Sequence, residues 1–298
     1  MRIDSYCIAC QIERQAQVAR ELLKPEDRYR YLLDVMDAIC RMPKDVSMPW
    51  TTPVFQDLRA KYGVTGDIYA EEKKWANDLV LPLLPRLWET VRSSGDPLLA
   101  ALKFAQAGNF LDFAILRKDD VDAGIEKTIR EAQDAALDET EYWHFADDLA
   151  EAKQLLILGD NAGEIAFDTL AVRQIQRQFP ALRVVYGVRG GYALNDATRE
   201  DSAYVGMDKL VTVIDNGSSI SATELSLLGS EMRREIEKSD VILAKGQANF
   251  ESLAGCGLNV YYNFLCKCER FCRILHVLPL TGMFLCDRRL PELETYPD

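Results

Sequence analysis

A short turn at residues 159–163 carries the residues best suited to chemistry. Asp160 and Asn161 are adjacent in the sequence Gly-Asp-Asn-Ala-Gly, and Glu164 and Asp168 follow closely. Carboxylate and amide oxygens of this kind suit a hard divalent cation. A simpler role is also open, in which Asp160 or Asn161 only caps the helix that follows. The turn alone does not distinguish a metal ligand from a helix cap.

The segments around this turn place it where α/β proteins bind ligands. Residues 155–158 are four consecutive apolar residues, typical of a buried strand, and apolar residues recur at helical spacing from residue 165 onward. The amino end of a helix at the carboxyl end of a strand attracts anions. The turn has only the glycines Gly159 and Gly163 and lacks the lysine of a P-loop, so it matches neither standard phosphate-binding motif. A cation and a phosphate bound together would suit this place.

Polar residues also follow other predicted strands. Asp196 could be a third oxygen ligand for a cation, or it could cap the next helix. Lys245 directly follows the apolar residues 241–244, where a lysine can contact a phosphate, although a solvated lysine is the simpler alternative. The sequence Asp215-Asn-Gly fits either a catalytic loop or a turn. These strand ends are expected to meet at one edge of a parallel sheet.

The second half of the chain alternates between strand and helix patterns, which predicts a doubly wound, mainly parallel sheet of the α/β class. The expected strands cover residues 155–158, 182–186, 209–214, 241–244, 260–264 and 283–286. The expected helices cover residues 164–177, 198–204, 221–238 and 268–275.

The first half of the chain is predicted to be almost entirely helical. The expected helices cover residues 8–23, 26–39, 54–62, 67–91, 98–107 and 118–150, with an interruption at Pro82 and Pro85. Asn109 and Asp112 follow the fifth of these helices and could point the same way, or they could be a C-cap and an N-cap. A change in composition near residues 145–153 divides the chain into a helical domain, 1–150, and an α/β domain, 151–298.

Composition excludes several classes of partner. The 298 residues carry a formal net charge of -12, which argues against nucleic acid or an anionic membrane surface as a partner. The sequence has no apolar run of transmembrane length and does not open with a signal-peptide pattern, so a cytoplasmic location is expected. The oligomeric state stays open.

The chain has eight cysteines, several of them grouped. Cys7 and Cys10 form a CxxC pair, and Cys266, Cys268 and Cys272 lie close together near the other end. Two such groups could build a zinc or iron–sulfur site that joins the first helix to the C-terminal segment. Packing of small side chains in the core is the simpler and slightly favoured interpretation.

Taken together, these motifs closely resemble the damage-control phosphatases, the metal-dependent family long catalogued as domain of unknown function eighty-nine. The resemblance runs nearly end to end. Cys7-x-x-Cys10 is similar to the largely prokaryotic branch of the family. The other matching segments are residues 107–112, residues 159–164, Asn195-Asp196 with Thr198, residues 245–253 and Lys267-Cys268.

The resemblance implies a helical N-terminal domain that packs against a Rossmann-like domain and contributes to the active-site cleft. It implies hydrolysis of small phosphorylated metabolites, sugar phosphates or cofactor-derived phosphates, with Mn²⁺, Co²⁺, Ni²⁺ or Mg²⁺. The family's metal ligands fall on Asp160, Asn161 and Asp196, and its phosphate-contacting lysine falls on Lys245. The catalytic set is then Asp160, Lys245, Asn109 and Asp112. The expected substrate-binding set is Asn161, Gly163, Glu164, Asn195, Lys245 and Asn249. Ser221 stands where relatives usually carry glycine.

Two routes of hydrolysis are compatible with these residues. A water molecule could attack the phosphorus, or Asp160 could attack it and form an aspartyl-phosphate. Two other functions are also open: an S-adenosylmethionine-dependent carboxyl methyltransferase, and a non-enzymatic protein that binds metal through its cysteines. Against the methyltransferase, the second strand ends in Tyr186-Gly187, where a ribose-binding acid would be expected.

Overall fold

The computed structural model describes residues 2–108, 129–130 and 137–290. Within these ranges, six strands form one sheet in the order β3-β2-β1-β4-β5-β6. Every pairing is parallel except that of β6, which runs antiparallel to β5 at one edge. The strands are β1 (Gln154–Leu158), β2 (Arg183–Val188), β3 (Thr212–Asp215), β4 (Val241–Lys245), β5 (Val260–Cys266) and β6 (Thr281–Cys286). The α/β class and the mainly parallel sheet are therefore confirmed.

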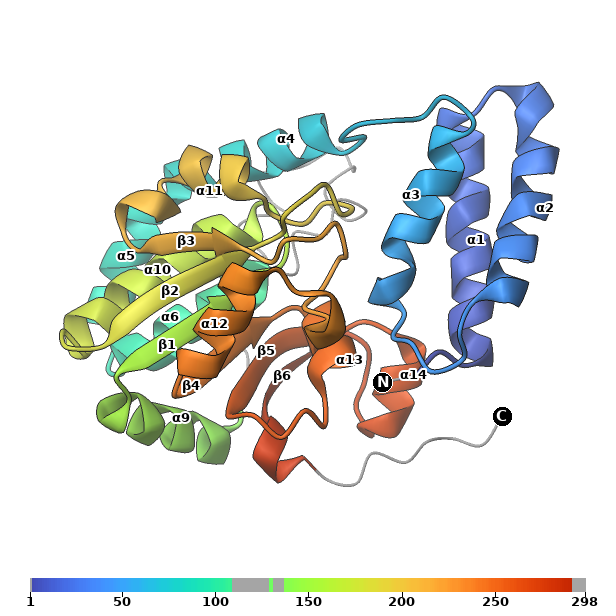
Figure 1. Ribbon diagram of the computed structural model, residues 1–298. Coiled ribbons are helices and arrows are strands. Elements are labelled where there is room, and N and C mark those ends of the chain that lie inside the picture. The colour runs from blue at the N-terminus through green and yellow to red at the C-terminus, as the bar shows by residue number, and fades with distance from the viewer. Residues whose placement is uncertain (1, 109–128, 131–136, 291–298) are drawn as a thin grey trace.

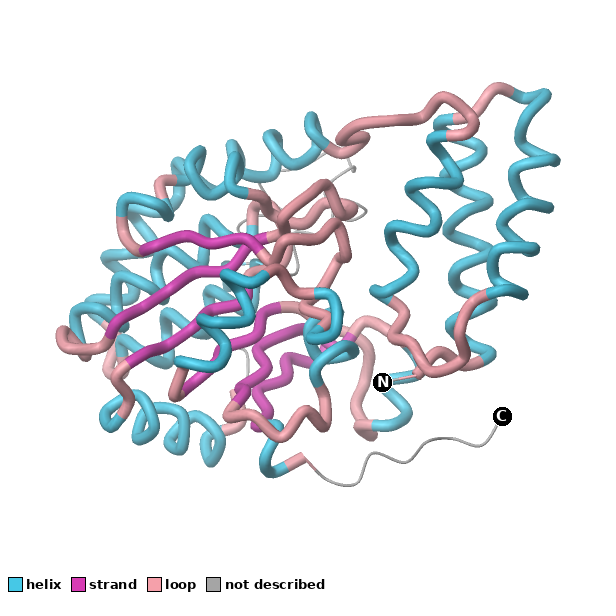
Figure 2. Tube along the Cα trace, viewed as in Figure 1, coloured by secondary structure: helices cyan, strands magenta, loops and turns pink. Residues whose placement is uncertain are grey.

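Both faces of the sheet are covered by helices (Figures 1 and 2). All five residues of β1 are buried, which is why this strand reads as an unbroken apolar run rather than an alternating one. Leu155 and Ile157 join one core, and Leu156 and Leu158 join the other. On the first face lie α5 (Leu84–Ser93), α6 (Pro97–Ala107), α9 (Glu139–Glu151) and α10 (Glu164–Gln178). On the second lie α12 (Ser230–Lys238), α13 (Gln247–Leu253) and α14 (Glu269–Ile274).

The first three helices stand apart from the helices that cover the sheet (Figure 1). These are α1 (Ser5–Leu22), α2 (Pro25–Arg41) and α3 (Thr52–Ala60), and they have a core of their own that includes Tyr31, Val35 and Phe55. The next helices, α4 (Ala70–Val80), α5 and α6, contribute to the core on one face of the sheet. That core crosses residue 150, at which the sequence predicts a domain boundary, whereas the core of α1–α3 lies within the first 64 residues.

The α1–α3 group contacts the loops at the carboxyl ends of the strands. The hydroxyls of Thr52 and Ser221 lie 2.9 Å apart, and the Gln56 side chain donates to the carbonyl of Tyr192 at 2.5 Å. At the N-terminus, Arg270 of α14 pairs with Asp4 and donates to the carbonyl of Arg2 at 3.0 Å. These contacts position α1 and α3 across from the sheet edge.

Several predicted boundaries differ from the structure. The expected helix 221–238 begins only at Ser230, because the segment before it folds back. There, the Asn216 side chain donates to the carbonyl of Ala222 at 3.1 Å. The backbone carbonyl of Asn216 accepts from Gly229 N–H at 2.9 Å. Strand β3 begins at Thr212 because Met207–Lys209 form a 3₁₀ turn.

Other predicted helices changed in number or extent. Helix α13 is missing from the predicted set, and the long helix 67–91 is interrupted at Pro82 and Pro85 as predicted. Of the helix expected at 118–150, the described part is α9 together with residues 129–130. None of the helices in the described ranges has the length and apolar character that a membrane span requires.

Candidate active site

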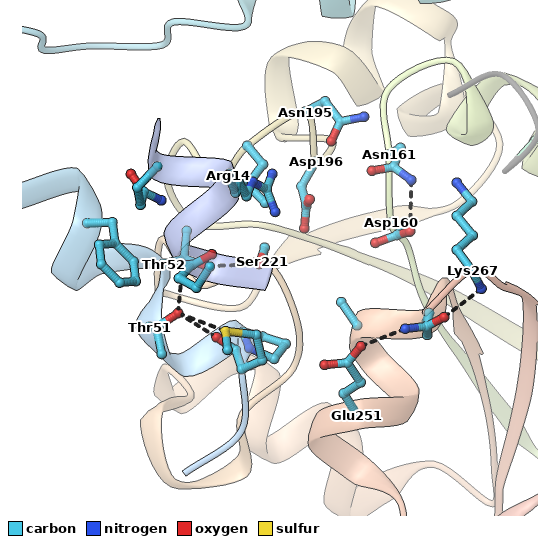
Figure 3. Close-up of a pocket in the computed structure, with 18 of the residues that line it drawn as sticks. Arg14, Thr51, Thr52, Asp160, Asn161, Asn195, Asp196, Ser221, Glu251 and Lys267 are labelled. Atoms are coloured by element: carbon cyan, nitrogen blue, oxygen red, sulfur yellow. Dashed lines mark hydrogen bonds between the residues drawn. The ribbon is translucent and has the colours of Figure 1, made fainter. Parts of the chain in front are cut away.

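The loops after β1 and β2 interlock and bring the predicted metal ligands together. Asn161 and Asp196 form an isolated antiparallel bridge, and Ala162 N–H donates to the Asn195 carbonyl at 2.9 Å. Ala197 N–H donates to the Asp160 carbonyl at 2.7 Å. Figure 3 shows the side chains of Asp160, Asn161 and Asp196 directed into one cavity. Backbone pairing between two loops therefore assembles a set of ligands that are 36 residues apart in the sequence.

A single buried guanidinium lies beside both carboxylates. Arg189, at the end of β2, donates through Nε to Asp196 at 2.5 Å, and its Nη2 lies 3.5 Å from Asp160. Burial, followed by the charges of Asp196 and Glu164, raises the pKa of Asp160 well above its usual range. Burial also raises the pKa of Asp196, although Arg189 opposes this shift. Two adjacent buried carboxylates with raised pKa values form a site that a cation would stabilise.

Gly246 permits this placement of Asp160. Its φ of +76° is one that residues with side chains rarely adopt, and an added Cβ would lie 1.9 Å from Asp160 Oδ2. The chain leaving β4 therefore passes directly beside the carboxylate at the end of β1. Strands β1 and β4 are neighbours on either side of the point where the strand order reverses, which is the usual ligand site in open α/β sheets.

The cavity in front of these residues has a volume of about 310 Å³ and lies between the sheet edge and α1–α3. This volume is near the lower end of the range for small-molecule sites. Asp160, Asn161, Asn195 and Asp196 line it, so four of the predicted site residues share one cavity. The lining residues outside the predicted catalytic, substrate-binding and metal sets are Gln11, Arg14, Gln15, Met48, Pro49, Thr51, Thr52, Phe55, Arg59, Gly108, Leu194, Ser221, Gln247, Ala248, Glu251 and Lys267.

Three cations line this cavity in addition to the predicted residues. Arg14 projects from α1, Arg59 from α3, and Lys267 from the segment after β5 (Figure 3 labels Arg14 and Lys267). Lys267 lies near enough to Asp160 to oppose the rise in the pKa of that carboxyl. Of these three cations, only Lys267 belongs to a sequence motif that matches the family. Arg14 and Arg59 look like ordinary charged residues of amphipathic helices, and only the packing of α1–α3 brings them to the site.

Lys245 does not line this cavity. Its side chain is completely buried, and Nζ lies 2.5 Å from Glu164, 2.8 Å from Asp168 and 2.8 Å from the carbonyl of Ala105. The Tyr186 hydroxyl donates to Asp168 at 2.6 Å and completes this buried cluster. Burial lowers the pKa of Lys245, but the two carboxylates outweigh it and hold the pKa above its ordinary value. The sequence placed Lys245 at the edge facing a phosphate, whereas the structure places its charge against two carboxylates.

The remaining predicted binding residues support the loops instead of lining the cavity. Gly163 donates its N–H to the Asn77 side chain at 2.7 Å, and Glu164 belongs to the buried cluster of Lys245. Asn249 is buried and donates to the carbonyls of Lys245 at 2.7 Å and Gly159 at 3.2 Å. Asn109 and Asp112 lie outside the described residues. Gly108, directly before them, lines the cavity.

Several cysteines lie near the junction of the two ends of the chain, for which the sequence leaves a metal site and core packing open. Cys7 and Arg270 are in contact, with Sγ and Nη1 4.0 Å apart, and the free thiols of Cys266 and Cys272 lie 3.5 Å apart. Among the residues with described positions, no group of three or more His, Cys, Asp and Glu side chains is placed to hold a metal ion. Charged and polar contacts between α1 and α14, including that of Arg273 with the Tyr6 hydroxyl at 2.7 Å, join the two segments.

The fold and the cavity define a Rossmann-like α/β protein with an oxygen-rich, polar pocket at the reversal point of its sheet. The model of the damage-control phosphatase ARMT1-like domain matches residues 3–278, and the chain belongs to this family. The resemblance read from the motifs is thereby confirmed.

Individual proteins are similar over most of the chain. A damage-control phosphatase of Archaeoglobus fulgidus is 30% identical over 284 residues, which cover 93% of this chain and 96% of the relative. A damage-control phosphatase of Pyrococcus horikoshii is 31% identical over 179 residues, 59% of this chain and 61% of the relative. A crystal structure of a DUF89 family protein from P. horikoshii superimposes with a TM-score of 0.82 at 23% identity, covering 96% of this chain and 99% of that one. This last likeness shows the fold.

Proposed function

We propose that this protein is a metal-dependent phosphatase that hydrolyses phosphomonoesters of small metabolites. The observation that carries the proposal is the convergence of Asp160, Asn161 and Asp196 from two neighbouring strand ends into one polar cavity. Membership of the damage-control phosphatase family supports the reaction class.

The donor set fits a hard divalent cation. Asp160 and Asp196 offer carboxylate oxygens and Asn161 offers an amide oxygen, which are ligands that Mn²⁺, Mg²⁺, Co²⁺ and Ni²⁺ accept. The Asn161 amide group donates to Asp160 Oδ2 at 2.8 Å, which leaves its carbonyl oxygen directed toward the cavity (Figure 3). When bound, such an ion would polarise the phosphoryl oxygens and lower the pKa of a coordinated water.

The protein's own residues have distinct roles in this proposal. Lys267, on the cavity wall near Asp160, offsets negative charge on the phosphoryl oxygens as the reaction proceeds. Asp160 either orients a water that displaces the alcohol from phosphorus, or attacks the phosphorus itself. In the second case the P–O ester bond breaks, the alcohol leaves, and water then hydrolyses the aspartyl-phosphate to release phosphate. Lys245 holds Glu164 and Asp168 beneath the loop after β1 and thereby positions that loop. The sequence predicts a different role for Lys245, a direct contact with the phosphate.

A panel of phosphorylated metabolites tests the proposal. The purified protein should release phosphate from some of them with Mn²⁺, lose this activity with a chelator and recover it with added metal. Asp196→Asn should lose the activity while Asp208→Asn, a matched change at an exposed carboxylate outside the cavity, should keep it. Full activity of Asp196→Asn at saturating Mn²⁺ would refute the metal assignment.

Neither alternative function gains support from the described residues. A methyltransferase of this fold would carry a ribose-binding acid after β2, where this chain has Arg189 bound to Asp196. A metal-binding role through the cysteines would need a group of ligands, and the described residues contain none.

A further inference from the structure

Arg59 is a buried cation with no anion beside it. Its side chain belongs to α3 and lines the cavity, yet the residue is only 6% exposed. Across residues 2–108, 129–130 and 137–290, its guanidinium forms no hydrogen bond or ion pair. Burial lowers the pKa of Arg59 for the same reason: its charge is removed from water without compensation. Such a group is costly unless a ligand supplies the missing anion.

Among the described residues, the ionisable groups that act on Arg59 include a second cation and no carboxylate. The ionisable groups that act on it are Tyr31, Tyr69 and Arg14, and the effect of Arg14 is repulsive. The Tyr31 hydroxyl is already committed, since it donates to the Gln15 side chain at 2.5 Å. Arg14 is exposed at the cavity wall, and its charge acts on both Arg59 and Asp196.

Part of the cavity lining is polar and uncharged. Gln11, Thr51, Thr52 and Ser221 form this part, with the Thr52 and Ser221 hydroxyls 2.9 Å apart and the Gln11 side chain donating to Thr51 at 3.4 Å. Amides and hydroxyls of this kind hydrogen-bond sugar-like hydroxyls or a polar linker. The cavity thus combines the predicted metal ligands at the sheet edge, a buried cation on α3 and neutral polar side chains, with Glu251 and Lys267 also in its lining.

We propose that Arg59, assisted by Arg14, binds a second anionic group of the substrate while the scissile phosphate lies at Asp160, Asn161 and Asp196. The inference rests on the proposed function and narrows the substrates to small phosphometabolites with a carboxylate or a second phosphate. Arg59 is assigned to this group and not to the scissile phosphate because its side chain belongs to α3, which lies across from the sheet edge that carries Asp160 and Asp196. A planar guanidinium binds either anion through two parallel hydrogen bonds.

Non-hydrolysable phosphonates test this subsite apart from catalysis. Calorimetry would compare ω-carboxyalkyl phosphonates of increasing chain length with alkyl phosphonates of equal length, with and without Mn²⁺. The carboxylated member of best length should bind about 10- to 100-fold more tightly than its alkyl partner, the scale of a hydrogen bond to a charged group. An α,ω-bisphosphonate series then distinguishes a phosphate from a carboxylate as the preferred second anion.

Variants of Arg59 and Arg14 show which arginine causes the preference for a second anion. Arg59→Met should abolish the preference and leave the Kd of the alkyl phosphonate within about twofold, whereas Arg59→Lys should retain part of it. Because Arg59 is buried, the thermal transition of Arg59→Met is measured alongside. Arg14→Met, at an exposed side chain, gives a second measurement with a smaller loss of preference.

Two results would overturn the inference: neither a carboxylated ligand nor a bisphosphonate binds more tightly than the alkyl phosphonate of equal length, or Arg59→Met weakens the alkyl phosphonates as much as the ligands with a second anion. The second result would place Arg59 on the scissile phosphate. Turnover of p-nitrophenyl phosphate separates this outcome from failure of the proposed function. An active enzyme without the preference refutes only the subsite, and a protein with the preference that releases no phosphate refutes only the hydrolysis.

Discussion

Two groups of charged side chains lie close together at the carboxyl ends of β1 and β4, and they differ in how their charges are compensated. In the buried cluster, Lys245 contacts both Glu164 and Asp168, and Tyr186 donates to Asp168. In the cavity, Asp160 and Asp196 share one guanidinium, and across the cavity Arg59 has no anion among the described residues.

The difference separates a charge that supports the fold from a charge that awaits a ligand. Burying an ion costs several kcal/mol, and a partner of opposite charge offsets that cost. The cluster of Lys245 meets this requirement within the protein, so it holds the loop in place. The cavity leaves charge of both signs incompletely compensated, which a metal ion and an anionic substrate together would complete.

The largest effect is expected from Asp160→Asn. Phosphatase activity should fall by about 10³-fold or more, the upper range for loss of one key electrostatic group. Stability of the metal-free protein should not fall, because the raised pKa of Asp160 means that folding disfavours its ionised form. Below its unfolded pKa near 3.9, the Asp160 carboxyl contributes fully to the stability of the fold. That contribution is lost as the pH rises through its higher folded pKa.

Denaturant unfolding across this pH range, without metal, checks the prediction. The wild-type free energy of unfolding should fall more steeply with rising pH than that of Asp160→Asn. A variant that is much less stable than the wild type at neutral pH would show that Asp160 belongs to a compensated cluster like that of Lys245.

The next largest effect is expected from Lys245→Met, which tests the buried cluster. The change leaves Glu164 and Asp168 buried without their cation and should cost about 3–5 kcal/mol in the free energy of unfolding. The phosphate contact predicted from the sequence gives a different result: a 10²- to 10³-fold loss in kcat/KM with stability intact. Urea unfolding and kinetics on the same preparation distinguish the two, with Lys153→Met as a control at an exposed lysine.

The same contrast explains which site residues could be predicted from the sequence. The predicted metal ligands lie in local motifs that follow apolar strands. The sequence therefore singles out Asp160, Asn161 and Asp196, and the structure brings them together. For Lys245, the sequence shows a lysine at a strand end. It does not show that Glu164, the first residue of α10, and Asp168, one turn later, both pair with its ammonium group. Compensation of a buried charge depends on packing between distant segments.

Arg14 and Arg59 could not be predicted as cavity residues from the sequence. Both lie in helices whose polar residues look like ordinary solvent-exposed positions, and they reach the cavity only because α1–α3 pack across the sheet edge. Similarly, the segment before α12 has helical composition, but the side chain of Asn216 folds it back into a loop. Local patterns identified strands and the loops that follow them, and long-range contacts decided the rest.

The smallest effect is expected at the junction of the chain ends, where the comparison extends to the cysteines. Asp4 and Arg270 form a largely buried ion pair there, and Arg273 donates to the Tyr6 hydroxyl. Burial raises the pKa of the Cys7 thiol to about 12, so this cysteine remains protonated at neutral pH and is a poor metal ligand without compensation. The junction therefore resembles the cluster of Lys245, whose charges are compensated by protein groups.

Cys7→Ser/Cys10→Ser should change the free energy of unfolding by about 1 kcal/mol and leave the metal content unchanged. Arg270→Met should cost about 1–3 kcal/mol, because Asp4 loses its cation. Thermal unfolding with elemental analysis of each variant measures both quantities. Loss of bound zinc or iron in the double cysteine variant, with a larger drop in stability than in Arg270→Met, would instead establish a thiolate metal site that joins α1 to α14.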